Sequence, residues 1–118
     1  MTIDDAARLA EERLADALPR PWRHVRSVAR RATWVAKELS LPDDLVTAAW
    51  LHDIGYAPGL AETGFHPLDG ARYLRRVGAD GQVVSLVAYH SCAQIEAEVR
   101  GLGAELASEF SPARLVAD

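Results

Sequence analysis

An imidazole and a carboxylate stand side by side at His52 and Asp53, within the stretch Trp50-Leu51-His52-Asp53-Ile54-Gly55. Both side-chain types bind divalent cations, and the apolar residues around them make simple packing a poor explanation, because an unpaired charge is costly to bury. Neighbouring residues on a helix point about 100° apart, so we expect both to reach one ion only where the helix ends. Gly55 is expected to provide that end, in the left-handed conformation that follows many helices.

Three further histidines, His24, His66 and His90, complete the four that the chain contains, and each is expected at or near a helix end. Imidazole together with carboxylate suits borderline divalent ions: iron, manganese, zinc, cobalt or nickel. Cys92 is the only cysteine, which excludes an internal disulfide and a thiolate-rich metal cage. A cation bound here would generate a nucleophilic water near neutral pH and neutralise charge on a phosphoryl oxygen.

The elements that must position these residues are all expected to be helices. Apolar spacing and caps predict helices over about 3–18, 22–39, 43–53, 67–77, 82–90 and 93–106, the last interrupted by Gly101 and Gly103, with a short one over 113–118 after Ser111-Pro112. Residues 83–87 would also fit a buried strand, but the helical neighbours and the lack of a partner strand favour helix. The prediction is an all-α, single-domain bundle of six to seven helices.

Length and composition are consistent with one ordinary globular domain over residues 1–118. The chain has 118 residues, is 49% hydrophobic and carries a formal net charge of −4. No apolar run approaches the roughly 20 residues that span a bilayer, and the N-terminus does not resemble a secretory signal. We therefore expect a cytoplasmic protein that binds no membrane and, given its negative charge, no nucleic acid.

Arginines gather between residues 20 and 31, around His24. Two interpretations stay open for them: a solvated helix face, or a local positive field that attracts a small phosphorylated molecule.

The ordered histidines resemble the HD superfamily of metal-dependent phosphohydrolases. His24 lies in Trp22-Arg23-His24-Val25 and precedes Leu51-His52-Asp53-Ile54-Gly55, in the order that the family uses. His66-Pro67-Leu68-Asp69-Gly70-Ala71 is similar to the His-Pro-x-x-Gly-Ala segment of members that hold two metals, and Ala88-Tyr89-His90-Ser91 to their next histidine. Those members include the HD-GYP cyclic-dinucleotide phosphodiesterases and bacterial hydrolases of diadenosine tetraphosphate. The resemblance covers roughly residues 20 to 92.

This resemblance implies a role for each residue. His24, His52 and Asp53 would hold one ion, and His66 and His90 a second. Asp53 would bridge the metals and orient the attacking water.

The family pattern closes with an aspartate, for which there are two interpretations. Asp118 follows an apolar run and could be that ligand, or the ligand could belong to sequence absent from this chain. Arg23 and Tyr56 are candidate substrate-binding residues, although Tyr56 stands where some relatives carry lysine.

The expected function is hydrolysis of a phosphoester or phosphoanhydride in a small, nucleotide-like substrate. One alternative is an HD-fold module that binds a metal or nucleotide without turnover and regulates a partner. A weaker one is an oxygenase with a di-iron centre. Neither the substrate nor the oligomeric state can be read from the sequence.

Overall fold

Seven α-helices and one short 3₁₀ helix make up residues 1–114, the part of the chain that the computed structural model describes. The helices are α1 (Ile3–Leu14), α2 (Pro19–Leu39), α3 (Asp44–Leu51), α4 (His66–Arg76), α5 (Gly81–Ala88), α6 (Ala93–Val99) and α7 (Gly103–Glu109), and the 3₁₀ helix η1 spans Ile54–Tyr56. The described residues contain no strand, so the stretch at 83–87 is helical. The predicted all-α class with six to seven helices is confirmed.

The junction between α1 and α2 lies earlier than the sequence suggested. A capping box between Thr2 and Asp5 begins α1, as expected where a hydroxyl and a carboxylate satisfy each other's backbone amides. The helix then ends at Leu14 rather than near residue 18. Pro19 and Pro21 do not separate the two helices. They lie in the first turn of α2, which begins at Pro19. Proline is tolerated there because the first amides of a helix have no partner.

The last predicted helix is not observed over its described residues. Ser111 to Arg114 have no helical assignment, so Ser111-Pro112 does not act as a cap and first turn there, and residues 115–118 lie outside the description. Upstream, the predicted break near Gly101 is confirmed: this glycine has φ +75° and separates α6 from α7. Gly103 does not interrupt a helix, however, because it begins α7.

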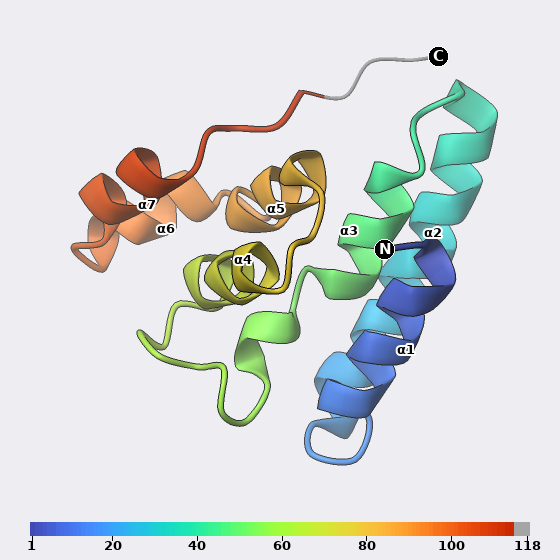
Figure 1. Cartoon of the computed structure of the whole chain (residues 1–118), viewed down its shortest axis with the longest axis horizontal. Coiled ribbons are helices and arrows are strands. Elements are labelled where there is room, and N and C mark those ends of the chain that lie inside the picture. Colours follow the sequence, from blue (N-terminus) through green and yellow to red (C-terminus); the bar gives the residue numbers. More distant parts are fainter. Residues whose placement is uncertain (115–118) are drawn as a thin grey trace.

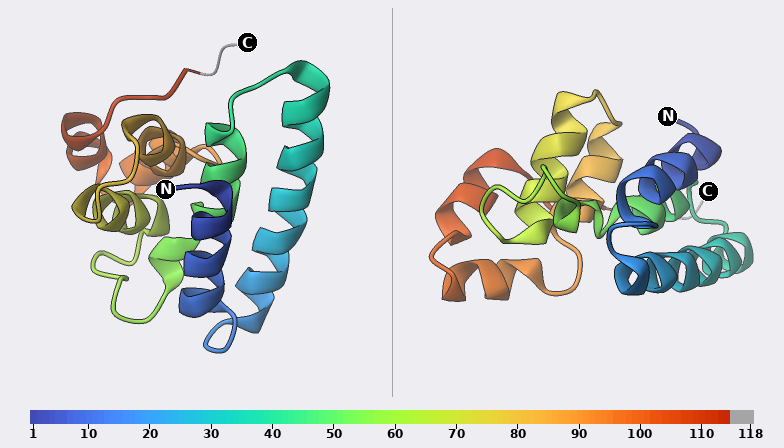
Figure 2. Two further views of the ribbon diagram at one scale, coloured as in Figure 1. Left: turned by 45° about the vertical axis from the view of Figure 1, so that its right-hand side comes forward. Right: turned by 90° about the horizontal axis from the view of Figure 1, so that it is seen from below.

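Helix α3 lies between α2 on one side and α5 on the other (Figure 1). Helix α3 lies centrally and contacts α1, α2 and α5, while α4 packs on α5 and on η1. Helices α6 and α7 pair with each other on the side of the molecule remote from α2, as the two further views also show (Figure 2). The end of α3 therefore lies where the first three helices meet the later ones.

Two apolar clusters hold this arrangement. The larger one runs from α1 through α3, α4 and α5 to Leu106 and Phe110 near the end of α7. The smaller one joins α2 to α3 through alanines, including Ala29 and Ala49. Trp50 packs against both clusters. Burial of these small side chains lets α2 and α3 approach closely, which brings residues on α2 within reach of the end of α3.

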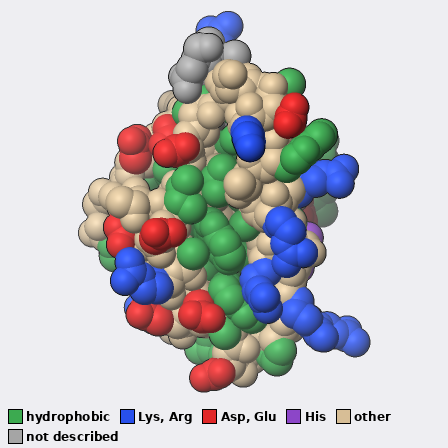
Figure 3. Space-filling model, turned by 90° about the vertical axis from the view of Figure 1, so that its right-hand side faces the viewer, with side chains coloured by type: hydrophobic (Ala, Val, Ile, Leu, Met, Phe, Trp, Pro, Cys, Tyr) green, Lys and Arg blue, Asp and Glu red, His purple; other side chains and the backbone are tan. Residues whose placement is uncertain are grey.

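The face made by α1 and α2 carries a band of hydrophobic side chains, with acidic groups mostly along one edge and basic groups mostly along the other (Figure 3). Among the described residues, no helix combines the length and apolar character needed to cross a membrane.

Candidate metal centre

Helix α3 ends in an abrupt change of backbone direction. His52 still has helical dihedral angles (φ −62°, ψ −28°), whereas Asp53 has φ −104° and ψ 9° and leads directly into η1. This change places the two neighbouring side chains together, with His52 Nε2 3.3 Å from Asp53 Oδ2. The prediction that both can reach one place because the helix stops is consistent with this geometry.

The predicted role of Gly55 at this helix end was wrong. Gly55 is not among the residues with positive φ and lies inside η1, so it does not end α3 in a left-handed conformation. It is required instead for a close approach: a Cβ atom at this position would lie 2.1 Å from the carbonyl oxygen of His66 and 2.7 Å from the amide nitrogen of Gly70. Gly70 faces it in turn, since its own Cβ would lie 3.1 Å from the Gly55 nitrogen.

This contact docks η1 against the first two turns of α4, at His66 and Gly70, and so sets the position of His66. His66 begins α4, next to Pro67 in its first turn. His66 Nε2 lies 3.3 Å from Asp53 Oδ1. The backbone approach at Gly55 therefore joins the two halves of the cluster.

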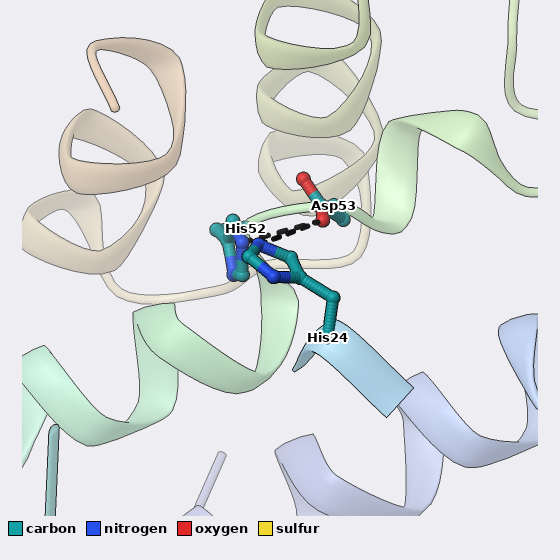
Figure 4. Close-up of side chains that lie close together, drawn as sticks. All are labelled: His24, His52 and Asp53. Carbon is teal, nitrogen blue, oxygen red and sulfur yellow. Dashed lines mark ion pairs between the residues drawn. The ribbon is translucent and has the colours of Figure 1, made fainter. Parts of the chain in front are cut away.

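Asp53 lies between two pairs of imidazoles, one pair at each carboxylate oxygen. His24 and His52 face Oδ2, at 3.9 and 3.3 Å. His66 and His90 face Oδ1, at 3.3 and 3.7 Å. Figure 4 shows the first pair, with His24 reaching from α2 toward the end of α3. The structure thus brings together the five described residues that the sequence singled out as metal ligands.

Backbone carbonyls orient two of these rings. His52 Nδ1 lies 2.6 Å from the Ala49 carbonyl oxygen and His90 Nδ1 lies 2.6 Å from that of Val87. A carbonyl can only accept, so each Nδ1 carries the hydrogen, and in the neutral ring the Nε2 lone pair faces the cluster. Such an outer hydrogen bond, which fixes tautomer and ring orientation, accompanies most metal-binding histidines.

The cluster is buried except on the side of His24. Asp53 and His52 are 7% and 9% exposed, whereas the His24 side chain is 60% exposed. Burial alone would raise the pKa of Asp53, but hydrogen bonds from His52, His66 and His90, which His52 and His90 can donate through Nε2 when their rings are protonated, outweigh it and hold this pKa well below its ordinary value. Burial would lower the pKa of His52, and the carboxylate of Asp53 together with the Ala49 carbonyl raises it instead.

The donor set fits divalent metal ions. Two three-residue groups, His24–His52–Asp53 and Asp53–His66–His90, each have ligand atoms within 4.8 Å of one another. The Nε2 atoms of His66 and His90 lie 3.0 Å apart. Two nitrogens that bind one ion at about 2.0–2.1 Å would be separated by roughly this distance when their bonds are at right angles. Asp53 belongs to both groups, one oxygen in each.

A hollow of about 550 Å³ gives access to the cluster, and Arg20, Tyr56 and Ser91 lie among its lining residues. Tyr56, a predicted substrate-binding residue, stacks on His66 with ring centroids 4.0 Å apart. Arg23, the other one, is exposed and is not among the described residues that line the hollow. Arg20 takes that place. Its spacing of four from His24 puts both on one face of α2, a signal that the sequence contained.

Two further predicted features have different outcomes. Asp118 lies outside the described residues. Asp69, by contrast, occupies one of the two variable positions in the His-Pro-x-x-Gly-Ala pattern. It is only 1% exposed. Its carboxylate accepts hydrogen bonds from the amides of Thr63 and Gly64 at 3.0 Å and from the Thr63 hydroxyl at 2.8 Å. It thereby fixes the loop that enters α4 just before His66. The signal in the sequence was the aspartate three residues after His66, in the first turn of the helix that His66 begins.

Two of three comparisons with known proteins found a match. A protein 45% identical over 76 residues is the tRNA (cytidine(56)-2'-O)-methyltransferase of Thermoplasma volcanium; the match covers 64% of this chain but only 22% of that protein. No solved structure matches the chain. A family model, that of the HD domain, matches residues 22–117, from just before His24 to beyond the described residues. The chain belongs to the HD domain family.

Proposed function

We infer that this protein is a metal-dependent phosphohydrolase that acts on a phosphoester or phosphoanhydride of a small, nucleotide-like molecule. The observation that carries the proposal is the position of Asp53, with each carboxylate oxygen facing two imidazole nitrogens. One ionised carboxylate shared by two histidine pairs is suited to hold two divalent ions side by side.

Residues of the chain have distinct roles in this proposal. His24, His52, His66, His90 and Asp53 would hold the ions, which would supply Lewis-acid chemistry by making a water nucleophilic near neutral pH and neutralising charge on the phosphoryl group. Asp53 would also orient that water, because its lowered pKa keeps it ionised.

Two groups at the mouth would bind the phosphate. The Arg20 guanidinium offers charge and paired donors for phosphate oxygens. Tyr56 offers a neutral phenol: burial and the nearby Asp53 raise its pKa, so it keeps its proton as a donor.

Metal analysis and turnover of variants test the proposal. Protein purified without chelator should contain a divalent transition metal and hydrolyse phosphate esters. Asp53→Ala should lose both, since it removes a ligand from each group. Thr33→Ala on α2 is a control, because the Thr33 hydroxyl bonds only to the Ala29 carbonyl. Full turnover in Asp53→Ala would refute the proposal.

A second candidate is a binding module that regulates a larger assembly without turnover. The match to only 22% of a longer protein named for another activity favours it. Metal-loaded protein that is inactive against a broad panel of phosphate esters, but melts at a higher temperature with one nucleotide, would support this candidate over the first.

A further inference from the structure

A second cavity, of about 460 Å³, adjoins the histidine cluster. It shares His24, His52 and His90 with the hollow described above. Its walls come from α2, α3 and α5, and from the segment after α7, which contributes Pro112. This volume lies within the range of about 300–1,000 Å³ typical of small-molecule sites.

The walls of this cleft are apolar and carry no formal charge apart from the histidines. Val28, Leu45 and Ala49 form one side, and Leu86 contributes to another. No Lys, Arg, Asp or Glu is among its described lining residues. The Tyr89 hydroxyl donates to the Phe110 carbonyl at 2.6 Å, so this ring presents its apolar surface. Among the described side chains that line the cleft, the hydroxyls of Ser85 and Ser91 remain as neutral hydrogen-bonding groups.

The two cavities thus differ in the chemistry they accept while sharing the same imidazoles. The hollow with Arg20 suits an anion. A charged group in the cleft would lose its hydration without gaining a partner, whereas an uncharged ring would gain from leaving water. A ligand that contacts both must join a phosphoryl group to an apolar body over the cluster.

We propose that the cleft beside the cluster binds an uncharged aromatic group of the phosphate ester, and that Ser85 and Leu86 of α5 determine this specificity. The proposal rests on the proposed phosphohydrolase function, and it adds that esters of small charged or sugar-like alcohols are poor ligands. Aromatic rings suit the site because Ser85 and Ser91 can bond to ring heteroatoms or substituents while the walls cover the ring faces.

Calorimetric titration with two phosphonates that are not hydrolysed tests the proposal. 1-Naphthylphosphonate and methylphosphonate share the anionic group and differ in the ring. We expect the naphthyl compound to bind at least about tenfold more tightly, a difference of 1.4 kcal/mol. Uncharged 1-naphthol, titrated into metal-loaded and chelator-treated protein, reports on the ring alone and should bind both forms equally well.

Variants of the cleft sharpen the test. Ser85→Phe fills the cleft and should abolish the preference for the naphthyl compound while leaving methylphosphonate affinity and metal content unchanged. Ser27→Phe is the matched control, because Ser27 is exposed on α2 and lines a different hollow. Leu86→Ala enlarges the cleft and should weaken naphthylphosphonate binding several-fold. This second variant tests the same proposal if Ser85→Phe does not fold.

Equal affinities of the two phosphonates, or an unchanged preference in both cleft variants, would overturn the proposal and leave the phosphohydrolase function standing. Binding of 1-naphthol that Ser85→Phe removes, in a protein that hydrolyses no phosphate ester, would support the cleft and refute the phosphohydrolase function.

Discussion

Replacing Gly55 by alanine should damage stability and metal binding together. The added Cβ would lie 2.1 Å from the His66 carbonyl oxygen and 2.7 Å from the Gly70 nitrogen, and both of these are backbone atoms that no rotamer change can move. Overpacking of a well-packed site costs typically 1–3 kcal/mol. With rigid partners on one side and the buried Ile54 of the 3₁₀ helix on the other, we expect about 3 kcal/mol, at the upper end of that range.

Thermal denaturation and metal analysis measure this effect. For a chain of this length, about 3 kcal/mol corresponds to a fall in Tm of roughly 10 °C. The separation of η1 and α4 that relieves the clash also moves His66 away from Asp53, so metal per chain should fall toward that of the His24–His52–Asp53 group alone.

Two other glycines provide graded controls. Gly70→Ala meets its nearest atom at 3.1 Å, and the gain of about 0.5–1 kcal/mol from replacing a helical glycine offsets part of that cost. Gly81→Ala, where nothing lies within 4 Å, should melt at or slightly above the wild-type temperature. The reasoning is refuted if Gly55→Ala melts within about two degrees of Gly81→Ala.

Three further predictions concern the loop before α4, the surface of α7 and the bound ion. Asp69→Asn should lower the free energy of unfolding by about 1–3 kcal/mol and weaken metal binding, because an amide cannot accept all the hydrogen bonds from Thr63 and Gly64. Chemical denaturation and metal titration measure these two effects. An unchanged free energy of unfolding and unchanged metal affinity would exclude a role of Asp69 in positioning His66. Hydrogen bonding from Arg72 lowers the pKa of Glu109 in the folded protein. The pair therefore stabilises the fold fully at pH values above the ordinary glutamate pKa of about 4.3. This stabilisation is lost as the pH falls through the lowered pKa of Glu109 in the folded protein. Glu109→Gln should therefore cost about 1 kcal/mol at pH 7, and its deficit relative to wild type should shrink in denaturation curves below pH 4.3; a pH-independent deficit would contradict the assignment. Chelator should lower Tm, by an amount equivalent to about 2.7 kcal/mol if the ion had been present at 100 times its Kd, and added metal should restore it.

Sequence reasoning located the helices that carry strong periodicity and the residues that carry chemistry. The end of α2 at Leu39 and the extent of α4 were predicted to within about a residue, because both have long apolar stripes and clear stop signals. The order of the four histidines pointed to a cluster, although His24 lies in the second turn of α2 and not at the helix end where it was expected.

The failures share one physical cause, which is that local patterns do not report tertiary contacts. At the end of α1 and at Ser111 to Arg114, the local helix signals did not decide where the helices lie. Gly55 was given the common role of a helix-terminating glycine, whereas its real constraint is a neighbouring backbone that lies 15 positions away at Gly70. Such a contact becomes visible only once α4 is placed.

Asp53 stands at the junction of two parts of the chain, with His24 and His52 contributed by the first three helices and His66 and His90 by the elements that follow. Cations held by the two groups, which have Asp53 in common, would tie residue 24 to residue 90 much as a covalent cross-link does, in a protein whose single cysteine cannot form one within the chain. Bound metal would then stabilise the packing of these two parts against each other. Metal starvation in the cell would therefore leave a protein that unfolds and is degraded more easily, as well as being inactive.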